Sequence, residues 1–267
     1  MDGPADLPPR TLRVAGVQMA MGDDPAANLE RAVALVREAV ANGAELVVLP
    51  ELFTRPYFPQ HAQRPEYLAW AEPIPGPTTD ALGALAGELG VAVVGSVYER
   101  AMAGLNYNTA IVFGPDGVLV GRTRKAHIPD DPGYAEKYYF APGDSGYPVH
   151  GVRLGVGEGR EAWVALGLAT CWDQWFPEVA RILALKGAEL IVYPTAIGSE
   201  PEYPTVDTHE AWRTVMRGHA VANAAFVMAV NRVGREGEMT FYGGSFVADP
   251  MGVVIAEAGT DVGLLEA

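Results

Sequence analysis

A nine-residue segment occurs twice in this chain, and the repeat constrains the fold more than any other feature. Residues 43–51 read Gly-Ala-Glu-Leu-Val-Val-Leu-Pro-Glu, and residues 187–195 read Gly-Ala-Glu-Leu-Ile-Val-Tyr-Pro-Thr. Each copy is a short apolar run that follows Gly-Ala-Glu and is closed by a proline. Such runs are typical of strands that are buried on both faces. We therefore predict two buried strands in equivalent positions of an internally duplicated fold.

The segments around the two copies also correspond. Before each copy we predict a strand and a helix, and after it a helix, a strand and a hairpin. In the first half we predict a strand at 11–17, a helix at 28–42, a helix at 78–89, a strand at 91–97 and a hairpin turn at 114–117. In the second half we predict a strand at 163–169, a helix at 177–186, a helix at 208–223, a strand at 225–231, a hairpin turn at 249–252 and a strand at 252–256. This order predicts an α/β fold with two stacked sheets, each covered on its outer face by a pair of helices, which is a four-layer α-β-β-α sandwich. We expect residues 1–267 to form one domain, because layered α/β folds often reach this length as a single unit.

The acidic composition limits the partners of the chain. It has 33 Asp and Glu residues against 19 Lys and Arg, a net charge of -14, which disfavours a nucleic-acid surface and favours a cationic substrate or partner. The single cysteine excludes an intramolecular disulfide. Neither a signal peptide nor an uninterrupted apolar stretch of about 18 residues is evident. We expect a cytoplasmic protein that binds neither nucleic acid nor membranes.

Neither a metal nor a nucleotide cofactor is expected. The glycine cluster at residues 155–159 follows neither the Walker pattern nor the dinucleotide-binding fingerprint. The histidines form no recognisable metal-ligand spacing, since they are scattered as His61, His127, His150, His209 and His219.

The cysteine lies where a nucleophile would be well placed. Cys171 follows the apolar run 163–169 and precedes Pro177 and Glu178, so we predict a strand that turns sharply into a helix with Cys171 on the turn. There its sulfur would face a pocket at the carboxyl end of the strand, near peptide N–H groups that can bind an anion. The alternative, from residue type alone, is a buried structural thiol.

A carboxylate is expected at the same edge of the fold. Glu51 ends the first repeated strand, where the second copy has Thr195, so only one copy carries an acid. The carboxyl ends of parallel strands meet at one edge, which would bring Glu51 within reach of Cys171 for proton transfer. A carboxylate that only caps the following turn is the alternative.

A lysine completes the candidate catalytic site. Lys125 leaves the first hairpin and enters residues 125–150, an irregular segment rich in Pro, Gly, Asp and Tyr. With Glu51 as the base and Cys171 forming a thioester, Lys125 and the backbone N–H of Trp172 would stabilise the oxyanion of a tetrahedral intermediate. Read alone, Lys125 is also compatible with a solvated surface lysine.

Three blocks of sequence resemble the signature motifs of the nitrilase superfamily of carbon–nitrogen hydrolases. They are residues 49–53, 124–129 and 171–173, and their order and spacing match that superfamily. The resemblance covers most of the chain and implies the α-β-β-α sandwich, a Glu-Lys-Cys triad, amidase chemistry and no metal. It further implies that a second glutamate, Glu136 by its motif, positions the lysine and the reacting groups, with an exposed loop carboxylate as the alternative.

A narrower resemblance is to the branch of this superfamily that hydrolyses N-carbamoylputrescine to putrescine, ammonia and carbon dioxide. It rests on the motifs at residues 127–134 with 136–137, at 171–178, at 194–201 and at 241–243. The pocket would then hold a four-carbon chain with an ammonium group at its far end. Tyr57 and Trp175 are candidate walls for the methylene chain, and Asp131, Glu200 or Glu202 are candidate partners of the ammonium.

Two other functions stay open from the sequence. An N-carbamoyl amino acid would need arginine to bind its carboxylate, and Arg213 and Arg217 on one helix face are compatible with that substrate. A simple ω-amide is the other alternative substrate. The alternative outside enzymology is a catalytically silent binding protein on the same fold.

The end of the chain and one inner segment depart from the superfamily pattern. Members usually continue past the last hairpin with a tail that packs on a neighbouring subunit, whereas this sequence ends at Ala267. We expect a homodimer or higher homo-oligomer that the short end weakens, and light scattering that shows a tight dimer at low micromolar concentration would contradict the weakening. The segment 151–161, with four glycines, is longer than the corresponding turn in relatives and has no assigned role.

Overall fold

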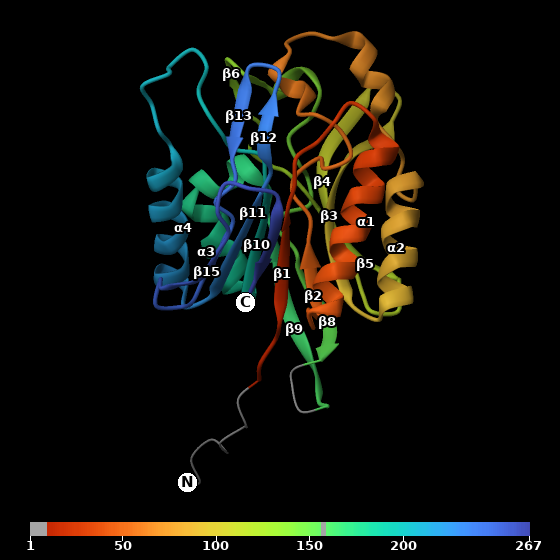
Figure 1. Cartoon of the computed structure of the whole chain (residues 1–267), viewed down its shortest axis with the longest axis vertical. Coiled ribbons are helices and arrows are strands. Elements are labelled where there is room, and N and C mark those ends of the chain that lie inside the picture. Colours follow the sequence, from red (N-terminus) through yellow and green to blue (C-terminus); the bar gives the residue numbers. More distant parts are fainter. Residues whose placement is uncertain (1–9, 156–158) are drawn as a thin grey trace.

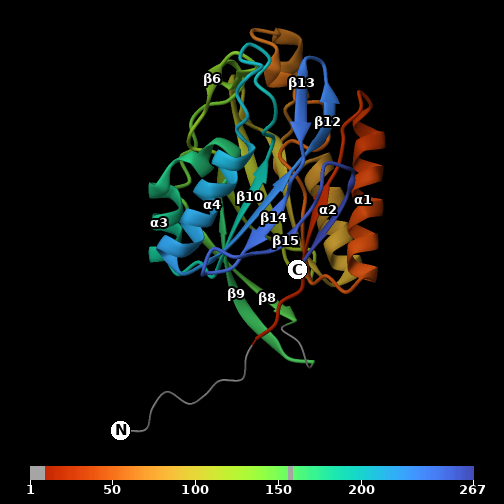
Figure 2. The ribbon, with the colours of Figure 1, turned by 60° about the vertical axis from the view of Figure 1, so that its left-hand side comes forward.

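The structure is a computed structural model that describes residues 10–155 and 159–267. Two six-stranded sheets pack against each other, and a pair of helices covers the outer face of each sheet (Figure 1). The helices are α1 (Pro25–Ala41) and α2 (Pro77–Leu89) on the first sheet, and α3 (Pro177–Leu185) and α4 (His209–Asn223) on the second. In the turned view, α3 and α4 lie toward one side of the molecule and α1 and α2 toward the other, with the strands between them (Figure 2). The four-layer α-β-β-α sandwich is confirmed.

Both sheets follow the same plan, with parallel strands in the middle and antiparallel strands at the edges. The first has the order β16-β1-β2-β3-β4-β5, and the second has the order β15-β14-β11-β10-β9-β8. The strands of the first sheet are β1 (Val14–Gln18), β2 (Leu46–Val48), β3 (Ala92–Met102), β4 (Leu105–Phe113), β5 (Leu119–Arg124) and β16 (Gly263–Glu266). Those of the second are β8 (Val149–Gly155), β9 (Glu161–Leu168), β10 (Leu190–Thr195), β11 (Phe226–Asn231), β14 (Phe246–Ala248) and β15 (Val254–Glu257).

Short elements gather at the end of the sandwich where the parallel strands finish. Two hairpins lie there, at the top of Figure 1. They are β12 (Val233–Glu236) with β13 (Met239–Tyr242), and β6 (Asp130–Asp131) with β7 (Tyr134–Ala135). The short 3₁₀ helices are η1 (Phe58–Gln60), η2 (Pro65–Trp70), η3 (Glu136–Tyr138) and η4 (Cys171–Trp175).

The repeated Gly-Ala-Glu has a structural cause in both halves. Gly43 follows α1 with a φ angle of +101°, and Gly187 follows α3 with a φ angle of +93°. Residues with a Cβ atom rarely adopt such positive φ angles, whereas glycine does so readily. The next glutamates fix the entry to the repeated strand, because Glu45 accepts a hydrogen bond from Arg13 N (3.1 Å) and Glu189 accepts one from Ala165 N (3.0 Å). In each copy of the repeat, the glycine therefore ends the preceding helix, and the glutamate fixes the start of the following strand.

Alternation along each central strand divides its side chains between two cores. In β2, Leu46 and Val48 enter the core between the sheets, while Val47 packs toward α1 and α2. In the second sheet, Leu190 and Val192 enter the same central core, and Ile191 between them packs toward α3 and α4. Because both faces of these strands are buried, their sequence shows a continuous apolar run in place of alternation.

Several boundaries differ from those that the sequence predicts. The first helix starts at Pro25, three residues before the predicted start, and Asp24 caps it by accepting from Ala26 N. The segment 125–150 is less irregular than expected, because it contains β6, β7 and η3 and its last two residues begin β8. Much of the segment 151–161 is the β8–β9 hairpin, and residues 156–158, with part of the glycine cluster, lie outside the described residues.

The last strand was not anticipated from the sequence. Residues 263–266 form β16, which pairs antiparallel with β1 and closes one edge of the first sheet. Its Leu265 is 2% exposed and belongs to the core between the sheets. No helix in the described part of the chain is long and apolar enough to span a membrane.

We expect the substitution Leu265→Ala to lower the free energy of unfolding by about 2–5 kcal/mol, as loss of a large buried aliphatic side chain does. Val262→Ala is the matched control, because Val262 is 50% exposed just before the strand, and it should cost less than about 0.5 kcal/mol. Denaturant unfolding of both variants measures the difference. Equal small losses would mean that β16 contributes little to the fold.

Candidate active site

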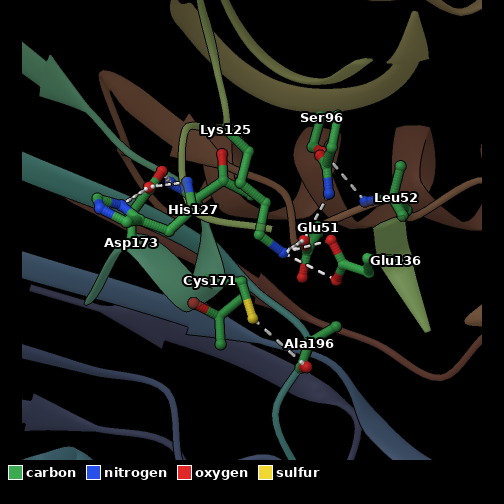
Figure 3. Close-up of polar contacts among 12 residues, drawn as sticks. Glu51, Leu52, Ser96, Lys125, His127, Glu136, Cys171, Asp173 and Ala196 are labelled. Atoms are coloured by element: carbon green, nitrogen blue, oxygen red, sulfur yellow. Dashed lines mark hydrogen bonds and ion pairs between the residues drawn. The ribbon is translucent and has the colours of Figure 1, made fainter. Parts of the chain in front are cut away.

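A buried lysine between two carboxylates forms the centre of the candidate site (Figure 3). Lys125 follows β5, and its Nζ lies 3.0 Å from Glu51 Oε1 and 2.8 and 2.7 Å from Glu136 Oε1 and Oε2. All three side chains are fully buried. A charged group is tolerated at that depth only when it is paired, so the two carboxylates and the ammonium need one another. Three of the four residues expected at the catalytic centre are thus in direct contact with one another.

A polar side chain on β4 fixes Glu51. Asn108 donates from its amide nitrogen to Glu51 Oε1 (2.6 Å), and its carbonyl oxygen accepts from the hydroxyl of Ser96 on β3 (3.2 Å). Glu51 Oε1 therefore binds both Asn108 and Lys125, whereas Oε2 is buried without a partner among the described residues. The free oxygen of Glu51 is available to accept a proton.

Cys171 stands on a strained turn, as the sequence predicts. It follows the carboxyl end of β9 and begins η4, which leads into α3. Its φ angle is +42°, a left-handed value that is uncommon for any residue with a side chain and that often marks functional sites. The sulfur lies 3.6 Å from the carbonyl oxygen of Ala196, beside the lysine and carboxylates (Figure 3).

A histidine–aspartate contact joins the lysine loop to the cysteine turn. Asp173, two residues after Cys171, accepts hydrogen bonds from His127 N (3.0 Å) and pairs with His127 Nδ1 (2.7 Å). Its other oxygen accepts from Thr170 N (3.2 Å). Because His127 lies two residues after Lys125, one carboxylate holds both loops in register.

The charges of the site shift its ionisation. Burial alone would lower the pKa of Lys125, but the nearby carboxylates of Glu136 and Glu51 outweigh it, and the pKa lies above its ordinary value. Burial raises the pKa of Glu136 to about 7 despite the opposing effect of Lys125. Burial and the charge of Glu51 raise the pKa of the Cys171 thiol well above its usual range. At neutral pH the resting cysteine is therefore a thiol, and a base must remove its proton during attack.

The candidate substrate residues occupy different positions. Tyr57 is fully buried and donates from its hydroxyl to Glu136 Oε1 (2.5 Å), which ties the second carboxylate in place. Trp175 is partly buried and packs against the core under α3 and α4. Trp172 is the second residue of η4, so its N–H directly follows the nucleophile position.

Two acids gather on one side of the site. Glu200 is half-buried on the loop after β10, and burial together with the charge of Asp131 raises its pKa. Two tyrosines, Tyr134 and Tyr242, feel the charges of both Glu200 and Cys171, which raise their pKa values beyond the effect of burial. Glu200 therefore lies on the side of the site that carries these two tyrosines, with Asp131 as its neighbour, and both Asp131 and Glu202 are exposed.

Arg213 and Arg217, the candidates for binding a substrate carboxylate, form contacts away from Cys171. Arg213 pairs with Glu257 on β15 (2.8 Å), and Arg217 donates to the carbonyl oxygen of Gly252 (2.7 Å). Both contacts hold α4 to the β14–β15 hairpin. The structure does not bring either arginine to the cysteine.

Sequence reasoning missed several residues that shape the site. Asn108 lies within a strand and Asp173 lies beside the expected nucleophile, yet neither was assigned a role. Asn108 gave little signal in the sequence, because its strand also carries Asn106 and Thr109, and only the structure shows that its amide is fully buried and needs a polar partner. Arg232, directly after β11, was also overlooked, although it ends a parallel strand at the same edge of the fold as Cys171.

Comparison with known proteins identifies the family. Residues 13–267 match the profile described as carbon-nitrogen hydrolase. The chain belongs to the carbon–nitrogen hydrolase family. The resemblance to the nitrilase superfamily is thus confirmed.

Relatives within this family are similar over nearly the whole chain. The N-carbamoylputrescine amidase of Solanum lycopersicum is 45% identical over 94% of this chain and 83% of its own length. The citrullinase of Francisella tularensis is 40% identical, over 92% of this chain and 84% of its own. The crystal structure of a carbon–nitrogen hydrolase from Helicobacter pylori superimposes with a TM-score of 0.87 at 38% identity, covering 96% of this chain and 88% of that one.

The raised pKa of Glu136 predicts a pH dependence. Below about pH 7 this carboxyl is protonated and cannot neutralise Lys125, so kcat/KM should rise as the pH rises through about 7. Glu136→Gln removes the ionisation, and this ascending limb should disappear while the remaining rate falls by roughly 10² to 10³-fold. Initial rates of ammonia release between pH 5 and 9 measure both. An unchanged pH profile in Glu136→Gln would show that another group controls the limb.

Proposed function

We propose that this protein is a thiol amidohydrolase that removes the carbamoyl group of N-carbamoylputrescine, releasing putrescine, ammonia and carbon dioxide. The observation that carries the proposal is the fully buried Lys125 held between Glu51 and Glu136 beside Cys171. Membership in the carbon–nitrogen hydrolases and 45% identity to an N-carbamoylputrescine amidase support the same reaction.

The first half of the proposed reaction forms a thioester. Glu51 Oε2 accepts the thiol proton while the sulfur of Cys171 attacks the carbamoyl carbon. The tetrahedral oxyanion is stabilised by the Lys125 ammonium and by the N–H of Trp172. Glu51 then gives the proton to the departing nitrogen, so ammonia leaves and the carbamoyl carbon stays bound to sulfur.

The second half uses the same groups in reverse. Glu51 accepts a proton from water, whose oxygen attacks the thioester carbon, and Lys125 again stabilises the oxyanion. Collapse of this intermediate breaks the carbon–sulfur bond, and Cys171 takes back the proton. The released carbamic acid separates into putrescine and carbon dioxide.

The far end of the proposed substrate is an ammonium group, and the acids beside the site suit it. Glu200 lies near Tyr134 and Tyr242, which also feel the charge of Cys171, and it is half-buried, so its charge is less screened than that of a surface carboxylate. Arg213 and Arg217 are engaged outside the site, which favours a cationic substrate over an N-carbamoyl amino acid. The net charge of -14 adds a long-range attraction for a cation.

Three expectations stay predictions from the sequence. They are that the chain forms one domain, that it is located in the cytoplasm, and that it assembles into a homodimer or higher homo-oligomer.

The proposed activity is tested by ammonia release from a panel of amides. N-carbamoylputrescine should be hydrolysed faster than N-carbamoyl-D-amino acids, citrulline and simple ω-amides, and Cys171→Ala should abolish turnover of all of them. Activity confined to citrulline or to ω-amides would retain the triad and reject the proposed substrate. Absence of turnover with every amide would favour a binding protein on this fold.

The ammonium site makes a second, independent prediction. Glu200→Gln should raise KM for N-carbamoylputrescine by roughly 10 to 100-fold, because a partly buried charged hydrogen bond contributes about 1.5–3 kcal/mol. N-butylurea, which has the same chain without the ammonium, should show no such change. Glu238→Gln, at an exposed position of the β12–β13 turn, is the control variant. Equal effects on the charged and uncharged substrates would place the ammonium elsewhere.

A further inference from the structure

A buried arginine from the second half of the chain grips the backbone around Glu51. Arg232 directly follows β11 and is fully buried. Its Nη2 donates to the carbonyl oxygen of Glu51 (2.7 Å) and to that of Leu52 (3.1 Å). A guanidinium can bind several acceptors at once in a fixed plane, so this contact sets the position of both peptide groups.

The backbone that it grips is strained. Leu52 has a φ of +49°, in the left-handed region that branched and bulky residues avoid. Such a residue keeps this conformation only where its surroundings impose it. Leu52 N donates to Ser96 Oγ (3.1 Å) on one side, and Arg232 binds the carbonyl oxygens on the other. The turn that carries Glu51 is thus held from both sheets.

The partner of this arginine extends the contact to Glu136. Arg232 Nη1 lies 2.8 Å from both carboxylate oxygens of Glu236 on β12. Glu236 Oε2 accepts from Tyr57 N (2.5 Å), and the hydroxyl of Tyr57 donates to Glu136. One ion pair therefore reaches both carboxylates that flank Lys125, through the main chain of Glu51 and through Tyr57.

Stability alone does not explain the buried ion pair of Arg232 and Glu236. Arg232 and Glu236 are 0% and 5% exposed, and a buried ion pair is often no more stable than apolar side chains of the same size. What it supplies is a fixed geometry, reinforced by the rings of Tyr57 and Phe241 that lie 5.7 and 5.2 Å from the guanidinium carbon. Misplacing a catalytic base by about 1 Å can cost about 10²-fold in rate.

We infer that Arg232 and Glu236 form a positioning pair that sets the geometry of Glu51 and Glu136 around Lys125. Among the described residues, neither member of the pair bonds to the sulfur of Cys171, and the pair acts through the carboxylates. This inference rests on the proposed function for its kinetic readout, so a second readout that needs no amide substrate accompanies it.

The test compares Arg232→Lys with wild type. Lysine keeps the charge but cannot bind two carbonyl oxygens and a carboxylate in one plane. We expect kcat for N-carbamoylputrescine to fall about 10² fold with KM within about threefold, because Glu200, the proposed partner of the ammonium, is unchanged. We also expect iodoacetamide to alkylate Cys171 about tenfold more slowly at pH 7, because proton removal by Glu51 is impaired.

Two further variants keep the test decisive. Glu236→Gln retains an oxygen for Tyr57 N and should lower kcat less than Arg232→Lys, and it serves if the arginine variant does not fold. Arg235→Lys, at an exposed position of the same hairpin, should leave kcat and the alkylation rate unchanged. Thermal unfolding of each variant separates lost stability from lost rate.

The result that would overturn the inference is a folded Arg232→Lys or Glu236→Gln protein with wild-type kcat and alkylation rate, even if its Tm is lower. If wild type hydrolyses no carbamoyl substrate, the proposed function fails, but slower alkylation in Arg232→Lys would still support the positioning pair. Equal alkylation rates in that case would overturn the pair as well.

Discussion

The rest of the site depends on the burial of one ammonium group. Lys125 has no exposed surface, and its charge is compensated by Glu51 and Glu136 at hydrogen-bond distance. Removing either carboxylate would leave a buried charge without its full complement, which is strongly destabilising. The surrounding contacts each fix one of the two carboxylates. Asn108 binds the Glu51 side chain, Arg232 binds the Glu51 carbonyl oxygen, and Tyr57 binds Glu136. These contacts hold the cluster in one geometry, and such preorganisation is the condition for electrostatic stabilisation of a developing oxyanion.

The duplicated fold explains where this cluster forms. Two copies of one strand–helix–strand plan place the carboxyl ends of their parallel strands at the same end of the sandwich, and the two halves differ there in chemistry. The first half supplies Glu51 and Lys125, and the second supplies Cys171 and Arg232. Contacts such as Arg232 with the Glu51 carbonyl and Asp173 with His127 cross between the halves. A site assembled in this way needs both sheets to pack correctly before any of its chemistry is possible.

Much of the architecture could be predicted from the sequence, because the repeated strands and their flanking helices carry strong local signals. Glu51, Lys125 and Glu136 were expected in one site, and the structure places them in contact beside Cys171. The missed elements depend on distant partners. β16 is only four residues long, and its pairing with β1 joins segments at opposite ends of the chain. Arg232 and Glu236 look like ordinary charged residues in the sequence, since only the folded structure shows that they are buried.

The most direct test of the central claim is the intact mass of the protein after rapid mixing with N-carbamoylputrescine and acid quenching. The account predicts that Cys171 of the wild-type protein gains the mass of the substrate less ammonia within the first turnover. It predicts that a folded Lys125→Met protein acquires this adduct at least about 10² fold more slowly. An adduct that forms at the wild-type rate without Lys125, or on a residue other than Cys171, would contradict the account.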